Sequence, residues 1–240
     1  AQAISVILSL GIIKKRGLPF ELSRKSIKFH KGITSKIIKY GAPISLQDGL
    51  VHLSFLAIMI IGNSMGVIPS AGIGVAEKLV GFIMLIPSSF SQAVSAFVAQ
   101  NYGAKKYDRA RKVLLYSISA SLCCGVVMFY FIFFHGDLLA GMFSKDREVV
   151  LAAWEYMKAY GIDCLLTAIM FSMVGYFNGC GKTTFVMIQG IVGAFCVRIP
   201  VSYLMSKILP VSLFKVGLAT PMSTFVQIIL CVCLLYTSDA

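Results

Sequence analysis

Acidic side chains are scarce in this sequence, and charge of either sign is limited. Asp and Glu number 10 in 240 residues against 22 Lys and Arg, and only 13% of the residues are charged. Water-soluble domains carry about 25% charged residues. With 58% apolar residues and a mean hydropathy of +0.83, the chain has too little polar surface for a soluble domain of its length. The positive charge lies in short stretches between apolar segments and not along one polar face, which excludes a typical nucleic-acid-binding surface.

Catalytic and metal-binding patterns are also missing. The seven cysteines show no paired spacing that would hold zinc, and no His-Glu-x-x-His run occurs. A Gly-Lys-Thr run at Gly181–Thr183 lacks the glycine that a P-loop requires five residues earlier, where Tyr176 stands. The sequence therefore predicts no enzyme, no metal site and no cofactor, and the cysteines are read as small buried hydrophobic residues.

Long apolar runs, by contrast, are abundant. Because a hydrocarbon core of about 30 Å needs about 20 helical residues, each of six runs is long enough to cross a membrane. The predicted fold class is an all-α membrane protein with a six-transmembrane-helix bundle. Trp154, Tyr156 and Tyr160 cluster at the start of the fourth run and are read as an interfacial aromatic belt. The six runs cover residues 40–63, 71–99, 113–135, 152–178, 184–209 and 216–236.

The segments around these runs define the expected domain organisation. Residues 1–13 are apolar but too short to span a bilayer, so they are read as the end of a truncated transmembrane helix. Residues 14–39 form a basic linker, residues 40–236 form the six-helix lobe, and 237–240 form a tail for which a cloning origin is one interpretation. Lys and Arg number fifteen in the connections on one side of the membrane and four on the other. The positive-inside rule therefore predicts that the linker Lys14–Lys39 is cytoplasmic.

Four short motifs together resemble a known family. They are Gly41-Ala-Pro43, Gln100-Asn-Tyr-Gly-Ala104 followed by Asp108-Arg-Ala-Arg111, Gly179-Cys-Gly-Lys-Thr183 and Val197-Arg-Ile-Pro200. In this order they resemble the C-terminal half of multidrug and toxic compound extrusion (MATE) transporters, and the resemblance covers nearly the whole chain. It implies a twelve-helix protein of the plasma membrane with two six-helix lobes and a central cleft. It also implies export of organic, often cationic, compounds coupled to inward proton or sodium flow. The expected partners are an organic substrate, membrane lipid and the N-terminal lobe, which usually carries an acidic residue in its first helix.

Asp48 and His52 are the first candidates for cation coupling. Ionisable groups inside membrane helices are costly, so they usually face a partner, a cavity or the bundle interior. Asp48 lies about 12 Å from the cytoplasmic end of the first span, and His52 follows one turn deeper on the same face. The pair is placed to pass a proton or hold a cation. The alternative is that both residues only make structural hydrogen bonds.

Asp163 and Arg198 form the second candidate site. Both are estimated to lie about 21 to 23 Å from the cytoplasmic end of consecutive antiparallel spans. A structural ion pair is therefore predicted, with a gating or coupling role for the pair as the alternative. Glu77 lies nearer the outer end of the second span and is a candidate gate carboxylate. The substrate-binding residues stay unassigned.

The resemblance places the acidic residues of sodium-coupled relatives near Val51 and Thr167, and neither is acidic. Asp48 and Asp163 stand about one turn away, which leaves a proton-coupled or displaced site open. The other functions considered are a flippase for lipid-linked sugars, a membrane scaffold without transport activity, and an intramembrane enzyme. Asp48 and Asp163 differ in estimated depth by about 10 Å, which argues against an aspartyl dyad.

Overall fold

The computed structural model describes residues 6, 11–13, 30–210 and 212–239. The chain divides into two units, Ala1–Lys39 and Tyr40–Ala240, and the second contains the helical bundle. Most of the segment 1–13 and residues 14–29 of the basic linker lie outside the described residues, as does residue 240. The end of the basic linker is the first part of a long helix, α2 (Lys31–Asn63), which continues into the first span.

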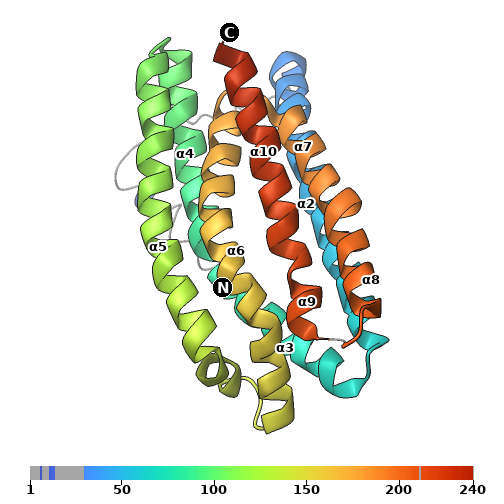
Figure 1. Ribbon diagram of the computed structural model, residues 1–240. Helices are drawn as coiled ribbons and strands as arrows, with labels where there is room; N and C mark the ends of the chain where they lie inside the picture. The colour runs from blue at the N-terminus through green and yellow to red at the C-terminus, as the bar shows by residue number, and fades with distance from the viewer. Residues whose placement is uncertain (1–5, 7–10, 14–29, 211, 240) are drawn as a thin grey trace. The chain divides into compact units, whose positions relative to one another are not determined.

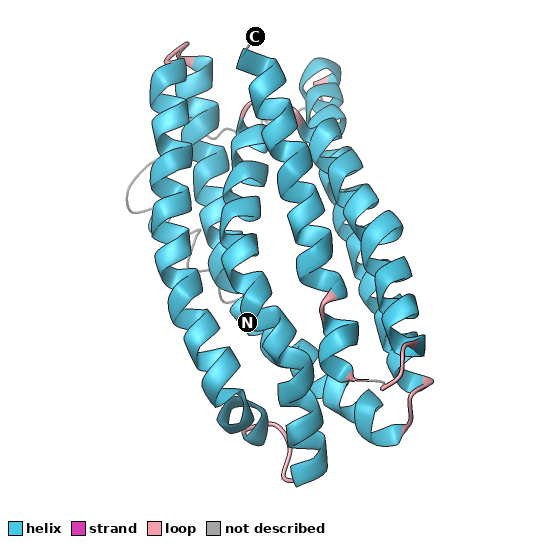
Figure 2. Ribbon diagram, viewed as in Figure 1, coloured by secondary structure: helices cyan, strands magenta, loops and turns pink. Residues whose placement is uncertain are grey.

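The described part of the chain is helical throughout, as Figures 1 and 2 show. Six stretches are long and apolar enough to span a membrane, which confirms the predicted fold class. Glycine at position 66 has a φ of 118°, and this left-handed conformation allows the tight turn between the first two spans. After α2 the elements are α3 (Val67–Ile83), α4 (Leu85–Gly103), α5 (Tyr107–Gly141), α6 (Arg147–Gly179), α7 (Thr183–Ile191), the π-helix η2 (Val192–Arg198), α8 (Ile199–Lys207), α9 (Leu213–Gly217) and α10 (Ala219–Asp239).

Helix α6 is the centre of the bundle. It packs against α3, α4, α5, α9 and α10, and it lies between α5 and α10 in Figure 1. Small residues allow this close packing. At Gly175 an added Cβ atom would collide with the backbone of Ser91 in α4, and at Gly125 it would lie 2.9 Å from the carbonyl oxygen of Cys164. The side chains on α6 are therefore the most enclosed in the lobe.

Three of the spans are interrupted two or three residues before a proline. A proline removes one backbone donor and clashes with the carbonyl group four residues earlier. Pro87 follows the break between α3 and α4 at Met84, and Pro221 follows the break between α9 and α10 at Leu218. Pro200 follows the π-helical segment η2. The fifth span thus contains a π-helix, a feature that is frequent at functional sites.

Two local interpretations from the sequence are wrong. Tyr156 and Tyr160 do not form an interfacial belt, because they are 0% and 1% exposed and lie inside the core. Only Trp154 of the three is partly exposed, with its indole nitrogen donating to the carbonyl oxygen of Phe133. The third apolar run is predicted to end at residue 135, whereas α5 continues up to Gly141, with a kink at His135.

The cysteines also differ in part from the expectation that they would be buried. All seven are free thiols. Cys164 and Cys231 are buried, whereas Cys123, Cys196 and Cys233 are exposed on the bundle surface. In a membrane, an exposed position on a helix faces lipid, which is apolar. The expected hydrophobic role of these three cysteines therefore requires lipid contact.

Candidate functional site

Asp163 lies at the middle of α6 with 1% of its surface exposed. The two groups that act on its carboxylate are the hydroxyl of Thr224, on α10, and the charge of Arg198. Among the described residues, its Oδ1 atom has no hydrogen-bond partner. A buried, charged oxygen without a donor is costly, whereas a protonated carboxyl group needs fewer donors. The surroundings of Asp163 therefore suit a group that gains and loses a proton.

Arg198 ends the π-helix η2 and connects it to α2. Its Nη1 donates to the hydroxyl oxygen of Ser54 over 3.1 Å, and Ser54 in turn donates to the carbonyl oxygen of Val51 over 2.7 Å. The guanidinium carbon lies 4.5 Å from the centre of the Phe55 ring, in a cation–π contact. Arg198 is 6% exposed, and its Nε atom has no hydrogen-bond partner.

The structure brings Asp163 and Arg198 into one electrostatic environment, as the estimated depths predicted. The direct salt bridge that was also predicted is not formed. Instead the Arg198 side chain donates to Ser54, and Asp163 Oδ1 is left unpaired. The physical reason is that two residues of α2 hold the guanidinium group, Ser54 by a hydrogen bond and Phe55 by a cation–π contact. A closer approach of Arg198 to Asp163 would therefore break its contacts with Ser54 and Phe55.

Two buried tyrosines and two threonines extend this site. The hydroxyl groups of Tyr156 and Tyr160 lie 3.2 Å apart, and Thr220 donates to the hydroxyl of Tyr160 over 3.3 Å. Thr224 donates to the carbonyl oxygen of Thr220 one turn earlier on α10. We call the connected residues the central polar cluster. Its members are Ser54, Tyr156, Tyr160, Asp163, Arg198, Thr220 and Thr224.

The sequence contains a signal for this cluster in the spacing of three residues on α6. Tyr156, Tyr160 and Asp163 follow one another at spacings of four and three residues, so they share one face of α6. The aromatic pair near a helix end was interpreted as facing the membrane surface. Because the two tyrosines share a helix face with an intramembrane acid, a position in the bundle interior is the better interpretation.

The π-helix is held to α10 by a second set of polar contacts. Ser223 donates to the carbonyl oxygen of Gly193 over 2.7 Å, and Gln227 donates to Ser223 over 3.1 Å. The Gln227 side chain packs directly on Gly193, where a Cβ atom would collide with its amide group. These contacts fix the segment that carries Arg198 against the helix that carries Thr224.

The remaining candidates lie outside the cluster. Asp48 and His52 are on exposed positions of α2. Glu77 is partly buried on α3, and its Oε1 atom is enclosed without a hydrogen-bond partner. Its charge acts on Tyr156, so Glu77 borders the cluster from the α3 side. Glu77 therefore interacts electrostatically with Tyr156 of the cluster, whereas Asp48 and His52 lie at exposed positions of α2.

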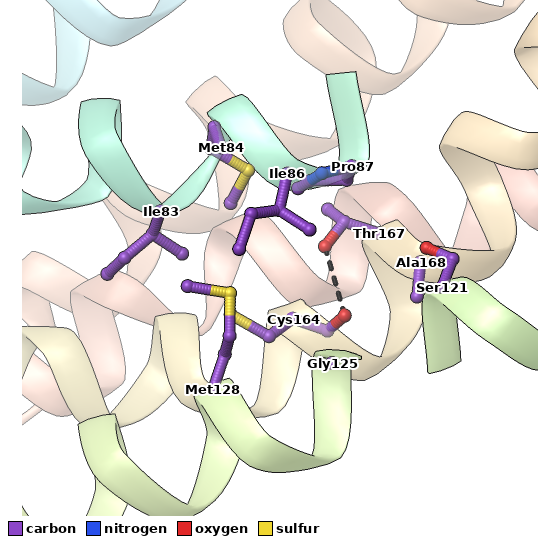
Figure 3. A pocket seen from close by; sticks show the side chains of 10 residues that line it. All are labelled: Ile83, Met84, Ile86, Pro87, Ser121, Gly125, Met128, Cys164, Thr167 and Ala168. Atoms are coloured by element: carbon purple, nitrogen blue, oxygen red, sulfur yellow. Dashed lines mark hydrogen bonds between the residues drawn. The ribbon is translucent and has the colours of Figure 1, made fainter. Parts of the chain in front are cut away.

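A small cavity lies between α6 and the break that joins α3 to α4, as Figure 3 shows. Its volume is about 10 Å³, and it is lined by residues that include Met84, Pro87, Gly125 and Cys164. The hydroxyl of Thr167 contacts the carbonyl oxygen of Cys164 over 3.3 Å at its edge. A space of this size holds about one water molecule. It is too small for an organic substrate and stands at the break between α3 and α4.

The sequence and the fold both match known proteins. The MatE family profile matches residues 43–204, well over half of the chain. The chain belongs to the MatE family. This confirms the resemblance read from the four motifs, and with it the prediction of a transporter family in place of an enzyme family.

Relatives with curated names include two MatE proteins of bacteria. The probable multidrug resistance protein YoeA of Bacillus subtilis is 23% identical over 96% of this chain and 51% of its own length. The multidrug export protein MepA of Staphylococcus aureus is 27% identical over 77% of this chain and 40% of its own length. This MatE chain spans about half the length of the curated relatives it matches.

Solved structures show the same fold. A MOP superfamily transporter from Pyrococcus furiosus superposes with a TM-score of 0.77 and 20% identity, over 88% of this chain and 48% of that protein. A MATE solved in complex with MaL6 superposes with a TM-score of 0.84 and 16% identity, over 93% and 52%. The MatE chain thus has the fold of about half of such a transporter.

Proposed function

We propose that this chain is the C-terminal lobe of a plasma-membrane exporter of organic, often cationic, compounds, and that it works with a second six-helix lobe. The names of the relatives, a probable multidrug resistance protein and a multidrug export protein, support the cargo class. The coverage of about half of each relative supports the second lobe. The cargo site lies in the cleft between the lobes, because transporters built from two repeats bind substrate at the repeat interface.

The coupling ion is a proton, and Asp163 carries it. The observation behind this assignment is the enclosed, unpaired Oδ1 of a carboxylate at the centre of an apolar bundle. A sodium ion needs several oxygen ligands, whereas a proton needs only the unpaired Oδ1 atom of Asp163. The charge of Arg198 also opposes a second cation beside the carboxylate. A proton neutralises Asp163 without any of these ligands.

Protonation changes the force between Asp163 and Arg198. When Asp163 is ionised, it attracts the guanidinium group away from Ser54 and Phe55. When Asp163 is neutral, this attraction is lost and Arg198 keeps its contacts with α2. Because Arg198 lies at the junction of η2 and α8, the two states favour different bends of the fifth span. A bound proton can shift the exporter between conformations only through such a difference in affinity.

Asp48 and His52 have a separate role in this proposal. Ionisable groups on a membrane helix avoid lipid, and both residues are exposed in the lobe by itself. We place them on the surface that faces the cleft or the second lobe. The alternative function as a flippase for lipid-linked sugars gains no support from Arg198, because this side chain is buried against Ser54 and Phe55.

The experiment measures ethidium efflux by the two-lobe transporter in proteoliposomes, with a proton gradient and a sodium gradient applied separately. We expect the proton gradient to drive efflux and the sodium gradient to have no effect. Asp163→Asn should abolish proton-driven efflux, whereas Asp137→Asn near the end of α5 should retain it. Efflux driven by sodium alone would reject the proton assignment. Full proton-driven efflux in the Asp163→Asn protein would reject the site.

A further inference from the structure

A furrow between α4 and α5 opens onto the outer surface of the bundle. It has a volume of about 320 Å³, and its lining is almost entirely apolar. Phe90, Ala93 and Phe97 contribute from α4, and Val113 and Tyr116 contribute from α5. Phe97 is 57% exposed and Tyr116 is 73% exposed, so large apolar side chains border an open space.

The furrow leads toward the most basic connection in the described part of the chain. Five cationic residues lie within Lys105–Lys112, with Asp108 as the one acid, and all six side chains are exposed. We call Lys105–Lys112 the basic turn. Arg109 and Lys112 precede Val113 and Tyr116 by four residues each on α5, so each charged residue lies directly above a furrow residue.

The basic turn has a defined shape. Lys106 donates its backbone N–H to the carbonyl oxygen of Asn101 over 2.8 Å, and Lys105 donates to that of Tyr102 over 3.0 Å. Lys105 has a φ of 58°, a left-handed conformation that the turn imposes on a residue other than glycine. Tyr102 and Tyr107 stack edge to face across the turn, with ring centres 5.1 Å apart. The backbone at the two lysines thus has a defined conformation.

The depths of the furrow and the basic turn match those of the acyl chains and the headgroup of a phospholipid. Phe97 and Phe90 precede the end of α4 by six and thirteen residues, which places the furrow about 9 to 20 Å below the basic turn. Exposed tyrosines such as Tyr102 and Tyr107 favour the headgroup level of a bilayer. The furrow then lies at the level of the acyl chains, and the cationic residues lie at the level of the phosphate.

We propose that the α4–α5 furrow and the basic turn together bind one anionic phospholipid, with an acyl chain in the furrow and the headgroup phosphate on Lys105 and Lys106. Charge complementarity selects this occupant, because basic pockets between membrane helices bind anionic headgroups. A zwitterionic lipid would leave the excess of positive charge unmatched. The inference concerns a surface distant from Asp163 and does not depend on the proposed export activity.

The test measures the apparent affinity of the chain for a fluorescent phosphatidylglycerol in phosphatidylcholine nanodiscs. One surface charge changes such binding about fivefold, so Lys105→Gln with Lys106→Gln should lower the affinity about 25-fold. Removing two charges at the other end of α5, with Lys145→Gln and Arg147→Gln, serves as the matched control and should leave the affinity unchanged. Equal losses in both double variants would overturn the site, because the effect would then report net charge alone.

A second variant tests the furrow. Ala93→Phe fills the space and should lower the affinity for phosphatidylglycerol, whereas Ala99→Phe, an exposed position of α4 outside the furrow, should not. Thermal unfolding in detergent verifies that each variant is folded. An unchanged affinity in the Ala93→Phe protein would overturn the proposal of a seated acyl chain.

The source of the phosphate is tested with soluble glycerol 3-phosphate. We expect it not to compete with the labelled lipid, and effective competition would show a site for free phosphate esters instead. The same titration with the two-lobe transporter tests whether the second lobe covers the furrow in place of a lipid. Retained lipid affinity supports the proposal, and complete loss would show that the second lobe covers the furrow.

Discussion

The electrostatic connection between Asp163 and Arg198 can be measured directly as an interaction energy. The perturbation is a double-mutant cycle with Asp163→Asn, Arg198→Met and the combined variant. Asparagine keeps the shape of the carboxyl group without its charge, and methionine keeps much of the length of the arginine side chain. Because both residues are buried, the surrounding solvent screens their interaction little.

The structure sets the expected magnitudes. At a pH where Asp163 is ionised, removing Arg198 leaves a buried carboxylate without its cationic neighbour, which costs about 3 to 5 kcal/mol of unfolding free energy. In the Asp163→Asn background the same change removes only the charged hydrogen bond to Ser54 and the contact with Phe55, and it costs about 2 to 3 kcal/mol. The cycle should therefore yield an interaction energy of about 1 to 2 kcal/mol.

The assay is denaturant titration of the purified protein in mixed micelles, with helix content as the signal for all four proteins. The difference between the two effects of Arg198→Met is the interaction energy. Effects that add to within about 0.5 kcal/mol would refute the reasoning, because they would show that the two charges do not act on each other. A cycle with Asp137→Asn in place of Asp163→Asn supplies the additive reference.

Three further predictions concern packing and the edges of the site. Gly175→Ala should lower the unfolding free energy by about 1 to 3 kcal/mol through collision with Ser91, while Gly81→Ala, which meets no neighbour, should not; thermal unfolding in detergent distinguishes them. Tyr160→Phe should lower it by about 1 to 2 kcal/mol, because the hydroxyl contacts of Tyr156 and Thr220 are lost; an unchanged melting temperature would contradict this. Asp48→Asn should leave the stability of the lobe unchanged but reduce ethidium efflux by the two-lobe transporter; unaltered efflux would remove Asp48 from the mechanism.

The sequence was sufficient to predict the membrane spans because their signal is strong and local. An apolar run of more than 20 residues has few alternatives to a membrane helix, and the interruption near Pro200 follows from a missing backbone donor. The depths of Asp163 and Arg198 followed from the helical rise alone. These predictions needed only the number of residues between each group and the end of its span.

Contacts between spans could not be predicted in the same way. The rotation of each helix decides whether Arg198 reaches Asp163 or Ser54, and residue counting does not contain this information. The distance of Tyr156 from the helix end fits both the membrane surface and the bundle interior, so residue counting does not decide between them. The π-helix η2 adds a further change of rotation just before Arg198, so even a correct helical wheel for the fifth span would have misplaced the guanidinium group.

The central claim of the proposed function is that Asp163 carries the coupling proton of an exporter of cationic compounds. The most direct measurement is proton release on addition of ethidium to the solubilised two-lobe transporter in weakly buffered solution, with no gradient present. The account predicts proton release from the native protein and from the Asp137→Asn control, and none from the Asp163→Asn protein. Equal proton release by the native and Asp163→Asn proteins, with ethidium bound by both, would contradict it.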